Sequence, residues 1–469
     1  MGQRRLVVIG GDAAGMSAAS QARRRKGPDE LGIVAFERGA FSSYSACGIP
    51  YWISGAVEHA EELISRSPEQ HRRNGIDLRM HTEVVSIDLD RRTVRAREGG
   101  DGERGGREYD EPFDDLVYAT GSVPMRPPVP GIDAPGVFGV QTLDDGAALR
   151  AALDGPAPGG GPVQRVVIVG GGYIGLEVAE ACQIRGLDVT VVDRSATPVI
   201  TFDPDVGEFI ADAVRKLGIG LVLSDGVAEI ETGRDGRATG VRTASGRHLP
   251  ADVVVLGLGV RPNVALAREA GVPLGPSGGI AVDHRMRTPV EGVWAAGDCV
   301  ESVHRLSGQR VVVALGTHAN KQGRVAGINL GGGYATFPGV IGTAITKLCD
   351  LEAARTGLSE REAERAGYRF VTAVADSTTK AGYFPGSAPI RLKLIAEQGS
   401  GRLLGAQIVG REDAAKRIDV LATAIWNEMD VEEILGLDLS YAPPFSPVWD
   451  PVLIAARKAA DAVVAERRG

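Results

Sequence analysis

Cysteine is scarce in this sequence, and its spacing excludes two common kinds of structural scaffold. Cys47, Cys182, Cys299 and Cys349 are the four cysteines of a 469-residue chain, and they form neither a CxxC pair nor a cluster with histidine. Disulfide-dense domains are usually small and secreted, and structural zinc needs closely spaced cysteine or histidine ligands. We therefore expect neither a disulfide framework nor structural zinc, and a reducing, cytoplasmic environment is the expected location.

The sequence also lacks long hydrophobic runs and an excess of basic residues. No apolar stretch approaches the roughly 20 residues of a membrane-spanning helix, and the apolar run near the N-terminus is too short for a signal peptide. The net charge of -8 argues against a broadly basic nucleic-acid surface. Neither a membrane nor a nucleic acid is an expected partner. The length instead predicts a globular protein of two or three domains.

The first nucleotide-binding pattern lies near the N-terminus. An apolar run over 6–9 predicts a buried strand, and Gly10-Gly11-Asp12-Ala13-Ala14-Gly15 leads into an alanine-rich helix. A second predicted strand ends in Glu37, which Arg38 follows. In such a βαβ unit the turn glycines let the backbone approach a pyrophosphate, and the acid after the second strand accepts ribose hydroxyls. Asp12 replaces the second glycine of the pattern, so this unit alone is weak evidence.

A better-formed copy of the same unit lies in the middle of the chain. A predicted strand over 166–169 precedes Gly170-Gly171-Gly172-Tyr173-Ile174-Gly175, and the following helix contains Leu176-Glu177. A further predicted strand ends in Asp193-Arg194. All three glycines of the pattern are present, between a strand and a helix, as the motif requires. Two such units predict two dinucleotides, a bound FAD and a visiting NADH or NADPH.

Cys47 is the candidate reactive residue. It lies in Ser42-Ser43-Tyr44-Ser45-Ala46-Cys47-Gly48-Ile49-Pro50-Tyr51, just ahead of an apolar, helix-like run. The positive end of a helix dipole favours the thiolate, so this placement predicts a nucleophile that is ionised at neutral pH. The alternative is a buried structural cysteine, the usual state of a lone cysteine. The two nucleotide units would give the sulfur a source of electrons and favour the reactive interpretation.

Further segments indicate how the domains are arranged. Residues 154–162 are rich in glycine and proline and mark a linker before the second unit. A strand ending in Ala296-Gly297-Asp298 would return the chain to the first domain, where Asp298 would bond to a flavin; an ordinary Asx turn is the alternative. Residues 98–112 are expected to form an exposed hairpin loop. We predict an FAD domain over 1–150 and 265–335, an NAD(P)H domain over 151–264 and a C-terminal domain over 336–469.

The order of these motifs resembles the pyridine nucleotide-disulfide oxidoreductases over essentially the whole chain. It runs from the first glycine pattern through Cys47, Ala119-Thr120-Gly121, the second glycine pattern and Ala296-Gly297-Asp298. Since no second cysteine lies near Cys47, the similarity is to the single-cysteine branch, which includes coenzyme A disulfide reductase, NADH oxidase and NADH peroxidase. The resemblance implies an α/β fold with two Rossmann-like domains, as in glutathione reductase, an α+β dimerisation domain and a homodimer.

Within this branch, several segments are similar to coenzyme A disulfide reductase. Its Ser-Phe-x-x-Cys motif is matched by Ser43-Tyr44-Ser45-Ala46-Cys47, so the resemblance assigns Ser43 both a catalytic and a substrate-binding role. Its phosphate-contacting stretch is matched by Ser20-Gln21-Ala22-Arg23-Arg24. Two tyrosines that reach the cysteine from the partner subunit are matched by Tyr383 and Tyr441. A solvated basic helix end and plain interface packing are the alternatives, and Ala46 replaces the family's asparagine.

The resemblance implies an FAD-dependent NAD(P)H:disulfide oxidoreductase that works through a mixed disulfide on Cys47, with coenzyme A disulfide as the main candidate substrate. Asp193 favours NADH because its carboxylate repels a 2′-phosphate, whereas Arg194 leaves NADPH open. Three alternatives stay open: an NADH oxidase or peroxidase using a cysteine sulfenic acid, a coenzyme A persulfide or polysulfide reductase, and a flavin redox sensor. The expected cofactor-binding residues are Gly10, Ala13, Ala14, Gly15, Glu37, Arg38, Thr120, Gly121, Asp298, Gly170, Gly172, Tyr173, Ile174, Gly175, Glu177, Asp193, Arg194 and Gly259.

Overall fold

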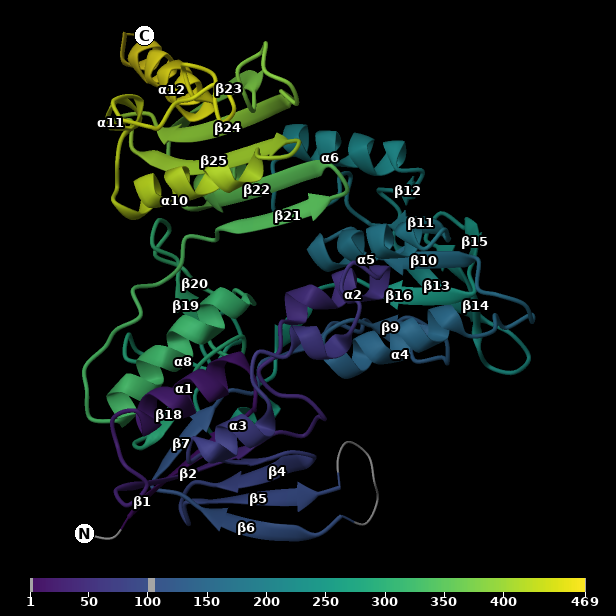
Figure 1. The fold of residues 1–469 in the computed structure, drawn as a ribbon, viewed down its shortest axis with the longest axis vertical. Coiled ribbons are helices and arrows are strands. Elements are labelled where there is room, and N and C mark those ends of the chain that lie inside the picture. Colours follow the sequence, from purple (N-terminus) through teal and green to yellow (C-terminus); the bar gives the residue numbers. More distant parts are fainter. Residues whose placement is uncertain (1–2, 100–105, 469) are drawn as a thin grey trace.

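A five-stranded parallel sheet organises the N-terminal lobe of the computed structural model, which describes residues 3–99 and 106–468 (Figure 1). Its order is β18-β7-β1-β2-β3, with β1 (Arg4–Ile9), β2 (Leu31–Phe36), β3 (Asp77–Arg79), β7 (Asp115–Tyr118) and β18 (Val293–Ala295). Residues 6–9 of β1 form an unbroken buried apolar run, because both faces of a parallel sheet are covered, whereas Arg4 and Arg5 at its start are exposed. β18 pairs with β7 although it lies far along the chain, so two separate segments build this lobe.

Two helices, α1 (Ala13–Arg23) and α8 (Gly316–Leu330), pack closely against each other beside this sheet. Their approach requires glycine, since a Cβ on Gly323 would lie 2.2 Å from the carbonyl oxygen of Ala14. A small antiparallel sheet of β4 (Thr82–Asp88), β5 (Thr93–Glu98) and β6 (Glu108–Pro112) adjoins the lobe. The hairpin loop predicted over 98–112 is therefore too long, because 108–112 pairs with β5, and its residues 100–105 lie outside the described part.

A second parallel sheet repeats the arrangement in the order β12-β11-β10-β16-β9. Its strands are β9 (Val137–Gly139), β10 (Arg165–Val169), β11 (Asp188–Val192), β12 (Gly220–Val222) and β16 (Val253–Leu256), and its helices are α4 (Leu143–Asp154), α5 (Tyr173–Ile184) and α6 (Pro204–Lys216). An antiparallel sheet of β13 (Val227–Thr232), β14 (Ala238–Thr243) and β15 (His248–Pro250) extends this lobe. β9 precedes the boundary predicted at residue 151, so the second sheet takes a strand from the segment assigned to the FAD domain.

The short helix α2 (Ile49–Ser54) belongs to the second lobe although its sequence lies within the first. Ile49, Trp52 and Ile53 are buried in the same apolar core as Leu176 of α5. Figure 1 shows α2, coloured purple, beside α5 and α4 of the teal lobe. The loop ahead of α2, which carries Cys47, is thereby held between the two lobes.

The C-terminal lobe is an antiparallel sheet in the order β21-β22-β25-β24-β23, packed against helices. Its strands are β21 (Ala344–Leu348), β22 (Leu351–Gly357), β23 (Phe370–Thr378), β24 (Pro389–Glu397) and β25 (Leu403–Gly410), and its helices are α9 (Glu360–Arg365), α10 (Ile418–Trp426), α11 (Val431–Leu435) and α12 (Pro451–Arg468). The shorter elements elsewhere are α3 (Pro68–Arg73), β8 (Ser122–Pro124), β17 (Val260–Pro262), α7 (Ala265–Glu269), β19 (Ser302–Val303) and β20 (Arg310–Val311).

The predicted fold class is confirmed: two Rossmann-like units are followed by an α+β lobe. No helix within the described ranges combines the length and the apolar character that crossing a bilayer requires.

Candidate active site

A cavity of about 750 Å³ lies where both nucleotide units and the Cys47 loop meet. Its wall takes residues from the first lobe and from α5 of the second. A cavity of this size falls in the range of roughly 300–1,000 Å³ that is typical of ligand sites. Among the residues predicted from the sequence, it is lined by Gly10, Ala13, Ala14, Glu37, Arg38, Cys47, Thr120, Gly121, Ile174, Glu177 and Asp298.

The first glycine-rich turn forms a cradle that a side chain would fill. A Cβ on Gly10, whose φ is +114°, would lie 2.1 Å from the carbonyl oxygen of Ala119, and one on Gly15 would lie 1.9 Å from that of Gly10. The Glu37 carboxylate is fixed at the end of β2, where it accepts hydrogen bonds from the N–H groups of Gly11 at 2.8 Å and Gly39 at 2.7 Å. This geometry fits an adenine dinucleotide such as FAD.

Asp12 occupies the turn where the pattern would have its second glycine. It is the N-cap of α1 but makes no side-chain capping bond, and its Oδ1 accepts a hydrogen bond from the backbone N–H of Tyr44 at 3.2 Å. Burial raises the pKa of Asp12 to about 6, and the carboxylates of Glu37 and Asp298 add to the rise. Asp12 therefore links the flavin turn to the cysteine loop, a role that the sequence pattern did not indicate.

Asp298 lies on the same cavity wall, as the sequence predicts. Its Oδ2 accepts a hydrogen bond from the hydroxyl of Ser122 at 3.0 Å, and Gln141 donates to the same hydroxyl at 3.0 Å. Burial raises the pKa of the Asp298 carboxyl. The residue is thus held by side chains that also line the cavity, and its carboxylate faces the space that a flavin would fill.

Cys47 lies in a short 3₁₀ turn, 46–48, directly ahead of α2, and lines the cavity. The prediction of a thiol ionised by the helix dipole is wrong. Cys47 is exposed as a residue, but partial desolvation of its thiol at the cavity wall raises the pKa of that thiol, and the carboxylates of Glu177 and Asp298 raise it further. These effects outweigh the one backbone hydrogen bond that favours the thiolate, because α2 has only six residues and two acids face the sulfur.

The catalytic and substrate-binding roles of Ser43 stay predictions, and the structure shows what its hydroxyl contacts. Its hydroxyl lies 2.9 Å from Nε2 of His71, a residue that is 1% exposed, and Ser43 does not line the cavity. Ser43 also has a φ of +51°, and its carbonyl oxygen accepts from the N–H of Ser65 at 2.8 Å. Ser43 and His71 thus anchor the loop that carries Cys47. No sequence motif around His71 indicates this contact.

Glu177 faces the cavity from the second turn of α5. Its Oε1 accepts a hydrogen bond from the Thr346 hydroxyl of the C-terminal lobe at 3.1 Å. Burial raises the pKa of Glu177 to about 7, which the Thr346 bond opposes and Glu180 reinforces. The carboxyl is therefore poised to gain or lose a proton near neutral pH, close to the Cys47 sulfur.

The second glycine-rich turn repeats the geometry of the first. A Cβ on Gly175 would lie 2.0 Å from the carbonyl oxygen of Gly170, and Gly172 caps α5. Both oxygens of Asp193 are used: Oδ2 accepts from the Gly171 N–H at 2.6 Å and Oδ1 from the Ser195 N–H at 2.7 Å. The structure thus brings together the residues predicted to bind the nicotinamide nucleotide, with Tyr173 at the start of α5 and Arg194 beside Asp193. Gly259, whose φ is +83°, follows β16.

The basic stretch on α1 is only partly available to a ligand. Arg23 donates to the backbone carbonyls of Gly75 at 3.2 Å, Lys26 at 3.0 Å and Leu31 at 2.7 Å, so its guanidinium ties the helix end to the sheet. These bonds occupy the guanidinium that was expected to contact phosphate, and that contact stays a prediction. Arg25, which the motif did not single out, donates to Oε1 of Gln21 at 2.9 Å. Arg24 is exposed on the same turn.

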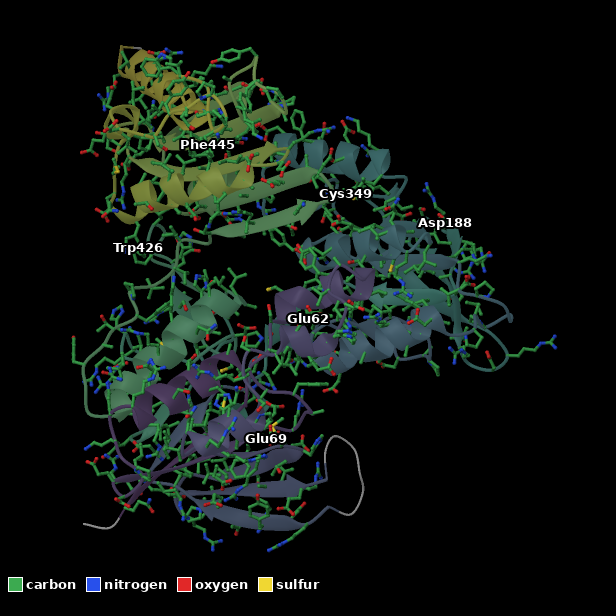
Figure 2. The ribbon with its side chains drawn as sticks, in the orientation of Figure 1. Glu62, Glu69, Asp188, Cys349, Trp426 and Phe445 are labelled. Atoms are coloured by element: carbon green, nitrogen blue, oxygen red, sulfur yellow. The ribbon has the colours of Figure 1, made fainter. Side chains whose placement is uncertain are left out.

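Tyr383 and Tyr441 lie together on the C-terminal lobe and do not line this chain's cavity. They are 79% and 48% exposed, and desolvation together with the hydrogen-bonded Tyr383 raises the pKa of Tyr441. We call the exposed set of Tyr383, Tyr441, Phe445, Val448 and Trp449 the aromatic patch. Figure 2 labels Phe445 on this lobe.

The other cysteines do not line the cavity. Cys182 and Cys299 are fully buried, and the pKa of each thiol is raised mainly by burial, to about 12 and about 11. Cys349 lies where the C-terminal sheet meets α5, and its N–H donates to Oε1 of Glu180 at 2.5 Å (Figure 2). Within the described ranges, Cys47 is the one cysteine that lines the cavity.

The chain matches known proteins along nearly its whole length. Residues 4–323 match the pyridine nucleotide-disulphide oxidoreductases, and residues 343–451 match the dimerisation domain of the same family. An NAD(P)H sulfur oxidoreductase (CoA-dependent) of Pyrococcus furiosus is 40% identical over 97% of this chain and 99% of its own length.

Two solved structures share the fold. Reduced CoADR-RHD of Bacillus anthracis superposes with a TM-score of 0.93 at 32% identity, covering 99% of this chain and 81% of that one. An NAD-dependent persulfide reductase from A. fulgidus superposes with a TM-score of 0.91 at 38% identity, covering 99% of this chain and 83% of that one. With two nucleotide units, one cysteine at their junction and these matches, the chain belongs to the pyridine nucleotide-disulphide oxidoreductases, enzymes that use FAD and a nicotinamide nucleotide.

Proposed function

We propose that the protein reduces a sulfur–sulfur bond of a small thiol, with coenzyme A as the favoured thiol, through a mixed disulfide at Cys47. The observation that carries this proposal is the position of Cys47, on a cavity lined by both nucleotide units, while the other three cysteines lie elsewhere. A thiol without a neighbouring thiol must form its disulfide with the substrate. We propose the predicted division into an FAD domain (1–150 and 265–335), an NAD(P)H domain (151–264) and a dimerisation domain (336–469), except that β9 and α4 pack with the second sheet and are assigned to the NAD(P)H domain.

The chain's own residues would hold both cofactors. Gly10, Gly15 and Glu37 would hold the adenosine and pyrophosphate part of FAD, and Asp298 would bond to its ribityl or phosphate oxygens. Gly170 to Gly175 and Asp193 would bind the nicotinamide nucleotide, with NADH favoured over NADPH. When bound, FAD supplies the electron pair that releases the second thiol from Cys47.

Protonation of Glu177 would control the reactivity of Cys47. The pKa of Glu177 is about 7, so near neutral pH this carboxyl holds a proton part of the time. A neutral Glu177 no longer opposes the negative charge of a Cys47 thiolate, whereas an ionised one raises the thiol pKa. Attack of the Cys47 Sγ on a sulfur–sulfur bond is therefore expected to depend on the charge of both groups.

The thiol is proposed from the relatives and from the remaining basic surface. The names of the Pyrococcus and A. fulgidus proteins refer to coenzyme A-dependent sulfur reduction and to persulfide reduction, so a coenzyme A persulfide stands beside coenzyme A disulfide as a candidate. Arg24 is exposed to contact phosphate groups, whereas Arg23 is committed to backbone carbonyls. In a homodimer the aromatic patch would be buried in the interface, and Tyr383 and Tyr441 would lie at the partner subunit's cavity.

One experiment distinguishes the candidate substrates. The mass of the Cys47 peptide from protein purified without reductant is expected to show a coenzyme A adduct or an added sulfur; an added oxygen would favour an oxidase using sulfenic acid. NADH oxidation is then followed with coenzyme A disulfide, coenzyme A persulfide or oxygen as acceptor. Cys47→Ser should keep bound flavin and lose the first two reactions, while Cys349→Ser should keep them. Full disulfide reduction by Cys47→Ser would overturn the proposal.

A further inference from the structure

A segment of five residues, 199–203, connects the second glycine-rich turn to the C-terminal lobe; we call it the bridge segment. At its first residue, the N–H of Val199 donates to the carbonyl oxygen of Gly171 at 2.8 Å. Val199 has a φ of +49°, a left-handed conformation that is rare for a β-branched side chain. Such a conformation persists only where surrounding contacts hold it, so the bridge segment needs anchors at both ends.

The C-terminal lobe supplies the second anchor through Arg355 of β22. This side chain is 5% exposed, and its Nη1 donates to the carbonyl oxygen of Thr201. Its Nη2 donates to the carbonyl oxygen of Gly357 at 2.7 Å and to Oε2 of Glu362 at 2.5 Å. A guanidinium presents several donors in one plane, which lets Arg355 hold Thr201 while its own position is fixed by the lobe.

The next residues of the bridge segment are anchored to the same lobe. Buried Asp203 donates its N–H to Oε1 of Gln407 at 2.9 Å and accepts from Nε2 of Gln407 at 2.6 Å. Nζ of Lys393, which is itself buried, lies 3.2 Å from Oδ2 of Asp203. The bridge segment is therefore clamped to the C-terminal lobe over residues 201–203.

The bridge segment in turn contacts the start of α5. The hydroxyls of Thr201 and Tyr173 lie 2.9 Å apart, and the rings of Tyr173 and Phe202 pack with centroids 6.4 Å apart. Tyr173 begins α5, whose next turn presents Glu177 to the cavity. A continuous set of contacts thus runs from Arg355 through Thr201 to Tyr173.

We propose that Arg355 and Thr201 are positioning residues for nicotinamide nucleotide binding, because they fix the hydroxyl and ring of Tyr173 at the first residue of α5, directly after the second glycine-rich turn. This inference rests on the proposed function in one respect, that the second unit binds the nucleotide. The C-terminal lobe would then help to bind the nicotinamide nucleotide of its own chain. This role is separate from any contact that the lobe makes with a partner subunit.

The test uses the purified flavin-containing enzyme and needs no disulfide substrate. Thr201→Val removes the hydroxyl that meets Tyr173 and keeps the side-chain size; Tyr173→Phe removes the other hydroxyl. Loss of a hydrogen bond of about 1 kcal/mol predicts a Kd for NAD⁺ raised about fivefold in either variant, measured by titration calorimetry. The double variant should show the same rise as each single one, since both remove one shared contact.

Arg355→Lys keeps the charge but not the planar fork, and is expected to raise the Kd for NAD⁺ in the same direction. Arg411→Ala, which removes an exposed ion pair with Asp350 on the C-terminal lobe, is the matched control and should leave the Kd for NAD⁺ unchanged. The KM for disulfide and the flavin content should stay constant in Thr201→Val. An unchanged Kd in Thr201→Val, or additive effects in the double variant, would overturn the inference. Failure of the wild type to reduce any coenzyme A sulfur compound would overturn only the proposed function, because nucleotide binding is measured separately.

Discussion

Oδ1 of Asp12 accepts a hydrogen bond from the backbone N–H of Tyr44 at 3.2 Å, and this contact joins the flavin turn to the loop that carries Cys47. A glycine at position 12 would allow close approach of a pyrophosphate but could not hold Tyr44. The chain thus places a carboxylate at the turn where the pyrophosphate of FAD would lie, and the two negative charges would repel each other. Burial raises the pKa of Asp12 to about 6, so the carboxyl is partly protonated and the repulsion is smaller.

This relationship predicts different effects on disulfide reduction for two substitutions of Asp12 that both keep FAD binding. Asp12→Asn keeps an acceptor for the Tyr44 N–H and removes the charge, so it should bind FAD about tenfold more tightly at pH 8, where Asp12 is ionised, and equally at pH 5. Asp12→Gly should also bind FAD well but lose disulfide reduction, because the cysteine loop is released. Flavin fluorescence on dilution measures the affinity. Equal pH dependence in Asp12→Asn and the wild type would contradict this account.

The Cys47 thiol is predicted to react slowly with alkylating reagents at neutral pH. Its pKa is raised above the ordinary 9.0 by burial and by the carboxylates of Glu177 and Asp298, and only the thiolate is alkylated. After reduction, the rate of modification by iodoacetamide should rise through pH 9 and beyond. Glu177→Gln removes one of the two charges and should move this rise to lower pH. Mass spectrometry of the Cys47 peptide follows the rate, with Arg411→Ala, which removes an exposed ion pair with Asp350, as control.

Glu177 is predicted to make the protein less stable as the pH rises. Its pKa is about 7 in the folded chain and 4.5 in its ordinary state, so the folded form binds more protons between these values and its free energy of unfolding falls as pH increases from 4.5 to 7. Glu177→Gln cannot ionise and should be more stable than the wild type at pH 8, by on the order of 2 kcal/mol, with no such gain at pH 4.5. Thermal unfolding at both pH values measures the difference. Asp188→Asn, an exposed change on β11 (Figure 2), should show no such trend.

Asp193 is predicted to govern the choice between NADH and NADPH. Its carboxylate is held by the N–H groups of Gly171 and Ser195 and would face a 2′-phosphate. Asp193→Ala should raise the kcat/KM for NADPH relative to that for NADH about tenfold or more, with Arg194 next to the new space. Flavin reduction rates with each nucleotide check this, and Asp188→Ala should leave the ratio unchanged. A ratio that stays constant in Asp193→Ala would place the adenosine elsewhere.

The aromatic patch is predicted to be a subunit interface. Phe445 is 73% exposed in the single chain, and Phe445→Asp would place a charge in a desolvated contact. We expect this variant to sediment as a monomer, to keep its flavin and to lose disulfide reduction, because Tyr383 and Tyr441 would no longer reach the partner's cavity. Tyr334→Asp changes an equally exposed aromatic residue of the first lobe and should remain a dimer. A dimeric Phe445→Asp would place the interface on another surface.

Local patterns sufficed for the fold and for the glycine-rich turns. The apolar run of β1, the turn at Gly10 and the acid Glu37 follow one another within a single βαβ unit, so their spacing alone places them in space. The domain boundary was harder to place, because β9 joins the second sheet from a segment ahead of the linker at 154–162. Such a pairing depends on contacts between distant residues, which no local pattern records.

The sequence predicted which residues form much of the site, but it did not predict their charge states or their hydrogen-bond partners. The sequence placed Cys47 before an apolar helix, which is correct, but α2 proved too short to lower the thiol pKa against burial and the distant acid Glu177. Arg23 matched a phosphate-contacting motif, yet the carbonyl oxygen of Leu31 lies within its reach and takes its guanidinium. Ser43 matched a catalytic position, yet His71 holds its hydroxyl.

The sequence by itself determined the two dinucleotide units and the C-terminal α+β lobe, and it indicated Cys47 as the candidate reactive cysteine, because each depends on residue types at fixed local spacing. Only the tertiary structure decided what surrounds that cysteine. The charge state of Cys47, the link from Asp12 to Tyr44 and the path from Arg355 to Tyr173 arise where segments distant in sequence are packed together, and the local dielectric and hydrogen-bond partners are fixed only by that packing.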